Sequence, residues 1–225
     1  MNGENSRATI LVFARAPEIG RVKTRLAAHL GAERAAEIHR ACLEDAIRLA
    51  ERVEGCERRL LMAGSRGAWA DAEIELDATW EMEPQRGHDL GERLETAFRE
   101  AFRRGAKKAT AIGTDTPWMG ARRIETAIAA LDADDVVLGP AADGGYYLVG
   151  MRRLIPKAFR QIAWGKQTVL EETRRKIERA GGSYRLIERD FDLDRIEDLE
   201  RARRRLMSEP ECAAALAAWL RTNRL

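Results

Sequence analysis

Residues 110–117 read Thr-Ala-Ile-Gly-Thr-Asp-Thr-Pro. The apolar run at residues 109–112 has the length of a buried strand, and Gly113 ends it. Pro117 cannot continue a ladder of backbone hydrogen bonds, so Asp115 should lie just beyond the carboxyl end of this strand. Ligands of open α/β sheets bind at that edge, and a carboxylate there suits a divalent cation. Alternatively, Asp115 caps a turn or the next helix.

The composition describes a soluble globular chain. Its 225 residues are 45% hydrophobic and 34% charged, enough for one domain with a sizeable core. A net charge of only +2 argues against nucleic acid or an anionic membrane as a partner. The three cysteines show no disulfide or zinc spacing. With no apolar signal segment and no membrane span, we expect a cytoplasmic protein; its oligomeric state stays open.

The loop after the first predicted strand, residues 9–13, is rich in positive charge. It leads into a helix and carries Arg15, Arg21, Lys23 and Arg25. Backbone amides, a helix dipole and cations together favour a polyphosphate ligand. The loop is neither a Walker P-loop nor a glycine-rich dinucleotide fingerprint. A polar connector in an arginine-rich chain is the alternative.

Two further loops carry candidate groups. In the first, Gln85 offers a donor and an acceptor to a nucleotide base, Gly87 follows, and Asp89 is a plausible helix N-cap. The alternative is that this loop is only the capped start of a helix. In the second, Asp143 precedes two glycines, whose turn lets the backbone approach a ligand. Asp143 could bind a metal, a sugar hydroxyl or an acceptor nucleophile. Alternatively, it belongs to a plain β-turn.

The last candidates follow the final predicted strand. Asp192 and Asp194 lie two residues apart on an extended segment, so their side chains should point the same way and both could bind one cation. Alternatively, Asp194 caps the helix that begins at about Arg195.

Apolar patterns that alternate between strand and helix periods predict an α/β fold with a mostly parallel sheet. The predicted strands are residues 9–13, 58–63, 74–81, 109–112, 136–139, 146–151 and 184–187. Three predicted helices cover residues 33–53, 122–131 and 209–222, and three more begin near residues 89, 169 and 195. We expect a single domain over residues 1–225, with a core at about 9–207 and a C-terminal helix at 209–222.

Five motifs occur in one order and together carry a resemblance. They are residues 13–26 (FARAPEIGRVKTRL), 85–93 (QRGHDLGER), 113–117 (GTDTP), 138–147 (LGPAADGGYY) and 192–199 (DLDRIEDL). This set resembles a bacterial glycosyltransferase-like family related to 2-phospholactate guanylyltransferase and often associated with arsenosugar biosynthesis. The resemblance covers residues 9–203.

The resemblance implies the GT-A nucleotide-diphospho-sugar transferase fold, a three-layer α/β/α arrangement around a mostly parallel sheet. It implies that Asp115 binds Mg²⁺ or Mn²⁺ and that Asp194 is the second ligand. Relatives read Asp-Val-Asp-Thr-Pro-Glu-Asp-Leu there, whereas this chain has Arg195 and Ile196 in place of Thr-Pro. We therefore expect the entry to the following helix to differ from that of the relatives.

The resemblance also implies a nucleotide or nucleotide-sugar donor and a small-molecule acceptor. The predicted nucleotide-binding residues are Arg15, Arg21, Lys23, Arg25, Gln85 and Gly87, and the predicted catalytic residues are Lys23 and Asp143. Glycosyl transfer from a nucleotide sugar is the first hypothesis. Nucleotidyl transfer to a phosphorylated small molecule is the second, and a non-catalytic nucleotide-binding module is the third.

Overall fold

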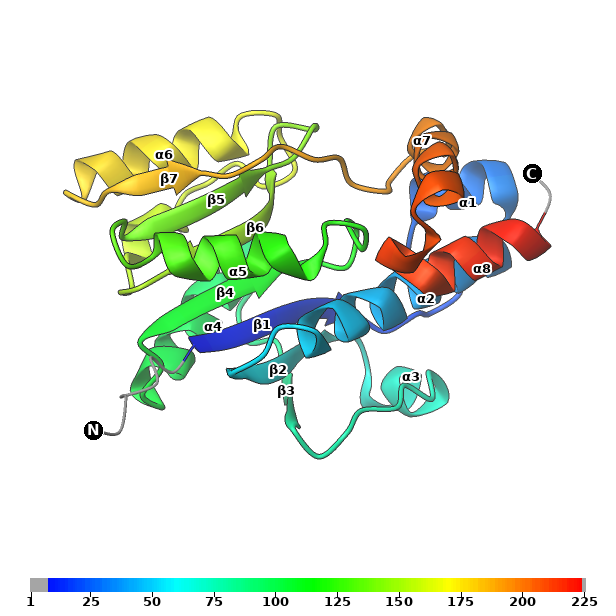
Figure 1. Ribbon diagram of the computed structural model, residues 1–225, viewed down its shortest axis with the longest axis horizontal. Coiled ribbons are helices and arrows are strands. Elements are labelled where there is room, and N and C mark those ends of the chain that lie inside the picture. The colour runs from blue at the N-terminus through cyan, green and yellow to red at the C-terminus, as the bar shows by residue number, and fades with distance from the viewer. Residues whose placement is uncertain (1–7, 224–225) are drawn as a thin grey trace.

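The computed structural model describes residues 8–223 (Figure 1). Its strands are β1 (Ala8–Arg15), β2 (Cys56–Ala63), β3 (Trp80–Pro84), β4 (Lys108–Ile112), β5 (Val136–Pro140), β6 (Tyr146–Met151) and β7 (Tyr184–Leu186). Its α-helices are α1 (Thr24–Leu30), α2 (Ala32–Glu51), α3 (Arg66–Asp71), α4 (Leu90–Arg103), α5 (Ala121–Ala130), α6 (Val169–Arg179), α7 (Ile196–Ser208) and α8 (Ala214–Thr222). Two short 3-10 helices are η1 (Pro156–Ala158) and η2 (Pro210–Ala213). No helix within the described range is long and apolar enough to cross a membrane.

The strands form one sheet in the order β3-β2-β1-β4-β6-β5-β7. Strand β1 pairs in parallel with β2 and β4, and the pairs β2–β3 and β5–β7 are also parallel. Strand β6 runs antiparallel to both of its neighbours. The predicted mostly parallel sheet is therefore confirmed. Because β1, β2 and β4 are parallel, the loops that follow them emerge at the same edge.

Helices cover both faces of the sheet and produce the three layers (Figure 1). On one face, Leu43 of α2 and Ile124 of α5 pack with β1 in one core cluster. On the other face, Phe98 of α4 and Ile177 of α6 pack with β4 and β5. Burial of each such side chain contributes about 1.5–3 kcal/mol. Apolar stripes at helical spacing thus place both helical layers.

A third cluster joins the sheet edge to the end of the chain. Helices α1, α7 and α8 gather beyond the carboxyl ends of β1 and β4 (Figure 1). The rings of Trp118 and Phe191 stack at 4.5 Å between centroids inside this cluster. The backbone N–H of Leu193 donates to the carbonyl of Asp115 at 2.8 Å. Residues about 75 positions apart are thereby held side by side at the sheet edge.

The third predicted strand was misplaced. It was expected at residues 74–81, whereas β3 spans Trp80–Pro84. Ile74 and Leu76 alternate as strand residues would, but they pack against the core from a loop. Their alternating apolar pattern is therefore explained by burial of the side chains and does not require backbone pairing in the sheet.

Candidate functional site

Lys23 occupies the centre of the site. It lies at the N-cap of α1 with φ 46° and ψ 42°, a left-handed conformation that a non-glycine residue adopts at a cost of about 1–3 kcal/mol. Its side chain is only 4% exposed, and the ammonium donates to the Asp115 carboxylate and to the Leu193 carbonyl. Lys23 therefore joins the β1–α1 loop, the end of β4 and the segment before α7.

The pairing of Lys23 with Asp115 keeps both groups charged. Burial alone would lower the pKa of Lys23, but the neighbouring Asp115 carboxylate, together with smaller contributions that include Asp194, raises that pKa above its ordinary value. Burial likewise opposes ionisation of Asp115, yet Lys23 lowers the pKa of this carboxyl. Asp115 caps no helix, because α5 begins at Ala121 with Gly120 as its N-cap.

In the segment before α7, Asp194 is not the residue that caps the helix. Asp198 accepts hydrogen bonds from the backbone N–H groups of Asp194, at 3.1 Å, and Arg195, at 2.7 Å. The residue at the N-cap is Arg195, so the alternative of Asp194 as the cap is wrong. The Asp194 side chain instead pairs with the exposed guanidinium of Arg25.

A pocket of about 470 Å³, here called the basic pocket, opens at this edge between the loops after β1, β3 and β4. Six predicted site residues line it: Arg15, Arg21, Lys23, Gln85, Asp115 and Asp194. Arg93 of α4 and His39 of α2 line it as well. Its positive side chains suit the charge of a polyphosphate.

A second pocket of about 640 Å³, here called the acidic pocket, adjoins the first. Asp115 and Asp194 line both pockets. The acidic pocket is also lined by Arg25, Ala142, Asp143, Gly165, Gln167, Phe191, Asp192, Arg195 and Asp198. The two predicted metal ligands therefore lie at the boundary between a basic and an acidic compartment.

Asp143 enters the acidic pocket from an anchored turn. Its Oδ1 accepts from the backbone N–H of Gly145 at 2.8 Å, and the carbonyl of Gly144 accepts from Leu170 at 2.9 Å. A Cβ on Gly144 would lie 2.2 Å from the carbonyl oxygen of Gln167, and its φ is +92°. Only glycine permits this approach, so the turn expected from the two glycines holds Asp143 in place.

Asp192 is half-buried in the lining of the acidic pocket, where Asp143 is exposed. Burial raises the pKa of Asp192 to about 7, and the nearby Asp115 and Asp143 carboxylates add to this shift. The hydroxyl of Thr116 donates to Asp192 at 2.6 Å and acts in the opposite direction. Asp192 lines only the acidic pocket, whereas Asp194 lines both.

The loop after β3 places its two candidates differently. The Gln85 amide nitrogen donates to the carbonyls of Ala14, at 3.1 Å, and Leu61, at 2.8 Å. Both of its N–H groups are used, which leaves the side-chain oxygen as its hydrogen-bonding group for a ligand. Gly87 lines neither pocket; a Cβ there would lie 2.7 Å from Glu92 and Arg93. Its backbone packs against the start of α4.

Two residues of the basic pocket had not been singled out from the sequence. His39 Nε2 lies 3.0 Å from the carbonyl oxygen of Arg15, and burial lowers the pKa of this imidazole. Arg93 Nε donates to the carbonyl of Gly87 at 3.1 Å. Both belong to helices with ordinary amphipathic patterns. Of the two residues, only Arg93 lies in a motif that carries the family resemblance, the DLGER end of residues 85–93.

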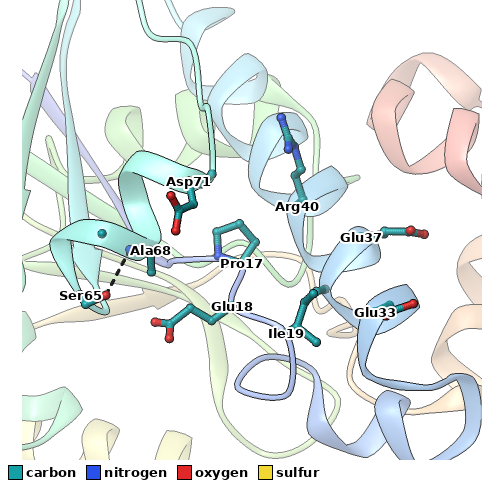
Figure 2. A pocket seen from close by; sticks show the side chains of 12 residues that line it. Pro17, Glu18, Ile19, Glu33, Glu37, Arg40, Ser65, Ala68 and Asp71 are labelled. Atoms are coloured by element: carbon teal, nitrogen blue, oxygen red, sulfur yellow. Dashed lines mark hydrogen bonds between the residues drawn. The ribbon is translucent and has the colours of Figure 1, made fainter.

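The largest of the described pockets, about 860 Å³, lies elsewhere. Figure 2 shows it between the β1–α1 loop, where Glu18 lies, α2 with Glu33 and Glu37, and α3 with Asp71. Arg40 is its cationic side chain, and no predicted site residue lines it. The lining has four carboxylates against one guanidinium, a charge balance that would repel a polyphosphate. We therefore place the candidate site at the basic and acidic pockets.

The donors at the boundary fit a metal that a substrate helps to hold. Within residues 8–223, no group of three or more His, Cys, Asp or Glu side chains is placed to bind a metal alone. Magnesium commonly takes one or two protein carboxylates and completes its shell with water and substrate phosphates. Asp115 and Asp194, between two pockets, supply that number of carboxylates.

The architecture is that of the nucleotide-diphospho-sugar transferases. A crystallised protein from Desulfovibrio desulfuricans G20, assigned provisionally to that class, matches with a TM-score of 0.89 and 31% identity over 97% of this chain and 95% of its own. The family model described as "Uncharacterized protein conserved in bacteria (DUF2064)" matches residues 46–166. The chain belongs to this DUF2064 family.

More distant structures share the fold. CMP:2-keto-3-deoxy-manno-octonic acid synthetase, in complex with CTP, has a TM-score of 0.53 and 16% identity over 91% of this chain and 99% of its own. The 4-diphosphocytidyl-2C-methyl-D-erythritol synthase of Anaerococcus prevotii DSM 20548 has a TM-score of 0.62 and 10% identity over 91% of this chain and 97% of its own. The search of curated proteins gave no match.

Proposed function

We propose that this protein is a metal-dependent transferase that moves a glycosyl group from a nucleotide sugar to a small-molecule acceptor. One observation carries the proposal: Asp115 and Asp194 separate a pocket rich in positive charge from a second pocket that holds Asp143. This arrangement suits a negatively charged donor on one side of the reacting bond and an acceptor on the other.

On the donor side, the β1–α1 loop would hold the diphosphate. Arg15, Arg21 and Lys23 line the basic pocket, and Arg25 lies at its boundary through its contact with Asp194. Their charges would stabilise the diphosphate as it departs. Asp115 and Asp194 would hold Mg²⁺ or Mn²⁺, which supplies further neutralisation of the leaving group. The oxygen of Gln85 would accept from a base N–H, whereas Gly87 would act through the backbone of its loop.

On the acceptor side, Asp143 would orient or deprotonate a hydroxyl. The hydroxyl oxygen forms a bond to the anomeric carbon, and the bond from that carbon to the diphosphate oxygen breaks. The nucleoside diphosphate leaves with the bonding electron pair, and the hydroxyl proton passes to Asp143. Such a base typically contributes about 10²–10⁴-fold to a rate.

Nucleotidyl transfer is the second candidate function. The fold is shared with a synthetase that binds CTP, and the same cationic loop could stabilise pyrophosphate as it departs. The resemblance to the arsenosugar-associated family supports glycosyl transfer instead. Release of pyrophosphate from a nucleoside triphosphate, rather than of a diphosphate from a nucleotide sugar, would favour nucleotidyl transfer.

The phosphate role of the cationic loop has a direct test. Calorimetry would compare nucleoside diphosphates with the matching nucleosides for the wild type, Lys23→Ala and Arg25→Ala. Each variant should lose about 1.5–3 kcal/mol of diphosphate binding free energy and much less for the nucleoside. Arg175→Ala, which removes an equal charge from α6, is the matched control. Equal losses for both ligand types would contradict the proposal.

A further inference from the structure

The acidic pocket differs from the basic pocket in the charge that it offers a second substrate. Asp115 and Asp194 belong to both pockets and would be neutralised by the metal proposed above. Among the other described lining residues, three carry a carboxyl group (Asp143, Asp192 and Asp198), two are arginines (Arg25 and Arg195), and none is a lysine. The basic pocket has the opposite excess, with Arg15, Arg21, Lys23 and Arg93.

Neither arginine of the acidic pocket is well placed to receive an anionic acceptor, because Arg25 is assigned above to the donor diphosphate at the boundary with the basic pocket. The guanidinium of Arg25 already pairs with Asp194, and its side chain is 61% exposed. Arg195 is exposed at the N-cap of α7. A phosphate or carboxylate here would lie among these three carboxyl groups, with no preformed bidentate clamp to compensate.

Hydroxyl groups fit the same lining well. A hydroxyl donates to a carboxylate and can accept from an amide, and Asp143 and Gln167 both face this pocket. The close packing of Gly144 on the Gln167 carbonyl fixes the spacing of the two segments that carry them. The backbone segments that carry the Asp143 carboxylate and the Gln167 amide are therefore held in place, which favours a defined binding geometry.

We propose that the acidic pocket binds a hydroxylated acceptor that carries no phosphate or carboxylate group. This inference rests on the proposed transferase function and narrows its acceptor class. The acceptor attacks through a neutral hydroxyl, loses that proton to Asp143 and gains the glycosyl group, while the nucleoside diphosphate retains the negative charge in the basic pocket. Charge is thus segregated between the two pockets throughout the transfer.

Four three-carbon probes of similar size would test the inference. Saturation-transfer NMR would rank glycerol, 3-aminopropane-1,2-diol, glycerate and glycerol 3-phosphate on the unliganded protein and on protein with Mg²⁺ and saturating inorganic pyrophosphate. Glycerol and the aminodiol should bind at least about fivefold more tightly than either anion, the factor expected for one unit charge 4 Å from another in water. Asp143→Asn should reduce this preference, whereas Glu33→Gln, in the pocket of Figure 2, should not.

The outcomes separate the inference from the proposed function. Equal or tighter binding of glycerate or glycerol 3-phosphate, or saturation transfer to none of the probes, would overturn the acceptor class. An unchanged preference in Asp143→Asn would also overturn it, because binding would then lie outside the acidic pocket. A separate calorimetric titration of pyrophosphate with Mg²⁺ is read independently of the probes. No pyrophosphate binding would count against the transferase proposal, while the probe ranking on the unliganded protein would still decide the charge preference.

Discussion

At Asp143, one carboxylate oxygen already has a structural partner, the backbone N–H of Gly145. Asparagine keeps an oxygen that can accept this bond but cannot take a proton from an acceptor. We expect Asp143→Asn to lower turnover about 10²–10⁴-fold and to leave donor affinity unchanged. Calorimetry of donor binding, together with turnover of a nucleotide sugar and its acceptor, checks both quantities. Turnover like that of the wild type would remove Asp143 from the catalytic residues.

Single residues differ in how far the sequence could place them. The position of Asp115 beyond a strand end could be predicted, because a short apolar run and Pro117 fix that end locally. His39 and Arg93 could not, since their approach to the basic pocket depends on how α2 and α4 pack. The capping alternative for Asp194 failed because α7 begins one residue later than that role requires, with Arg195 at the N-cap and its backbone N–H donating to Asp198 at 2.7 Å.

At the scale of elements, Gly91 sets the distance between α4 and the segment after η1. A Cβ at Gly91 would lie 2.2 Å from the carbonyl oxygen of Phe159, a backbone atom that cannot rotate away. Gly91→Ala should therefore lower the free energy of unfolding by about 1–3 kcal/mol in denaturant titrations. Gly67→Ala in α3 is the control, because no atom lies within 4 Å of its added Cβ. It should stabilise the protein by up to about 1 kcal/mol; equal effects of both substitutions would contradict this account of the contact.

Most element positions follow from periodic patterns, as for α4, where Asp89 accepts from the N–H of Glu92 at 2.8 Å and confirms the predicted N-cap. Strand β3 was displaced because it is an edge strand with an exposed Met82, so its buried face gives a weak signal. Which strands become neighbours is a long-range outcome that local periodicity does not specify.

At the scale of the whole molecule, Asp190 ties helices α5 and α7 to the sheet, where its backbone N–H donates to the carbonyl of Pro140 in β5 at 3.0 Å. Its buried carboxylate contacts Arg123 of α5 and Arg205 of α7 and accepts from the Trp118 indole at 3.2 Å. Burial opposes its charge, but the Phe191 N–H and the two arginines hold the pKa of Asp190 below its ordinary value. The stability gained from this ionised group is present above the unfolded-state pKa and is lost as pH falls through the lower folded-state pKa.

Asp190→Asn should therefore destabilise the protein in a pH-dependent way. The loss in free energy of unfolding should be about 3 kcal/mol above about pH 5 and should shrink below about pH 4. Denaturant titrations of both proteins across this range measure it, with Asp71→Asn on the exposed side of α3 as the control. A loss that stays constant from pH 7 to the acid limit of folding would show that charge is not its cause.

The central claim is that Asp115 and the cationic loop bind a nucleotide diphosphate together with a divalent cation. Calorimetry of the four common nucleoside diphosphates, with and without Mg²⁺, tests it on the wild type and on Asp115→Ala, each first shown by circular dichroism to be folded. We predict that at least one diphosphate binds the wild type, more tightly with Mg²⁺, and that Asp115→Ala loses the Mg²⁺ effect. The claim is contradicted if no diphosphate binds the wild type, or if Mg²⁺ tightens binding equally in both proteins.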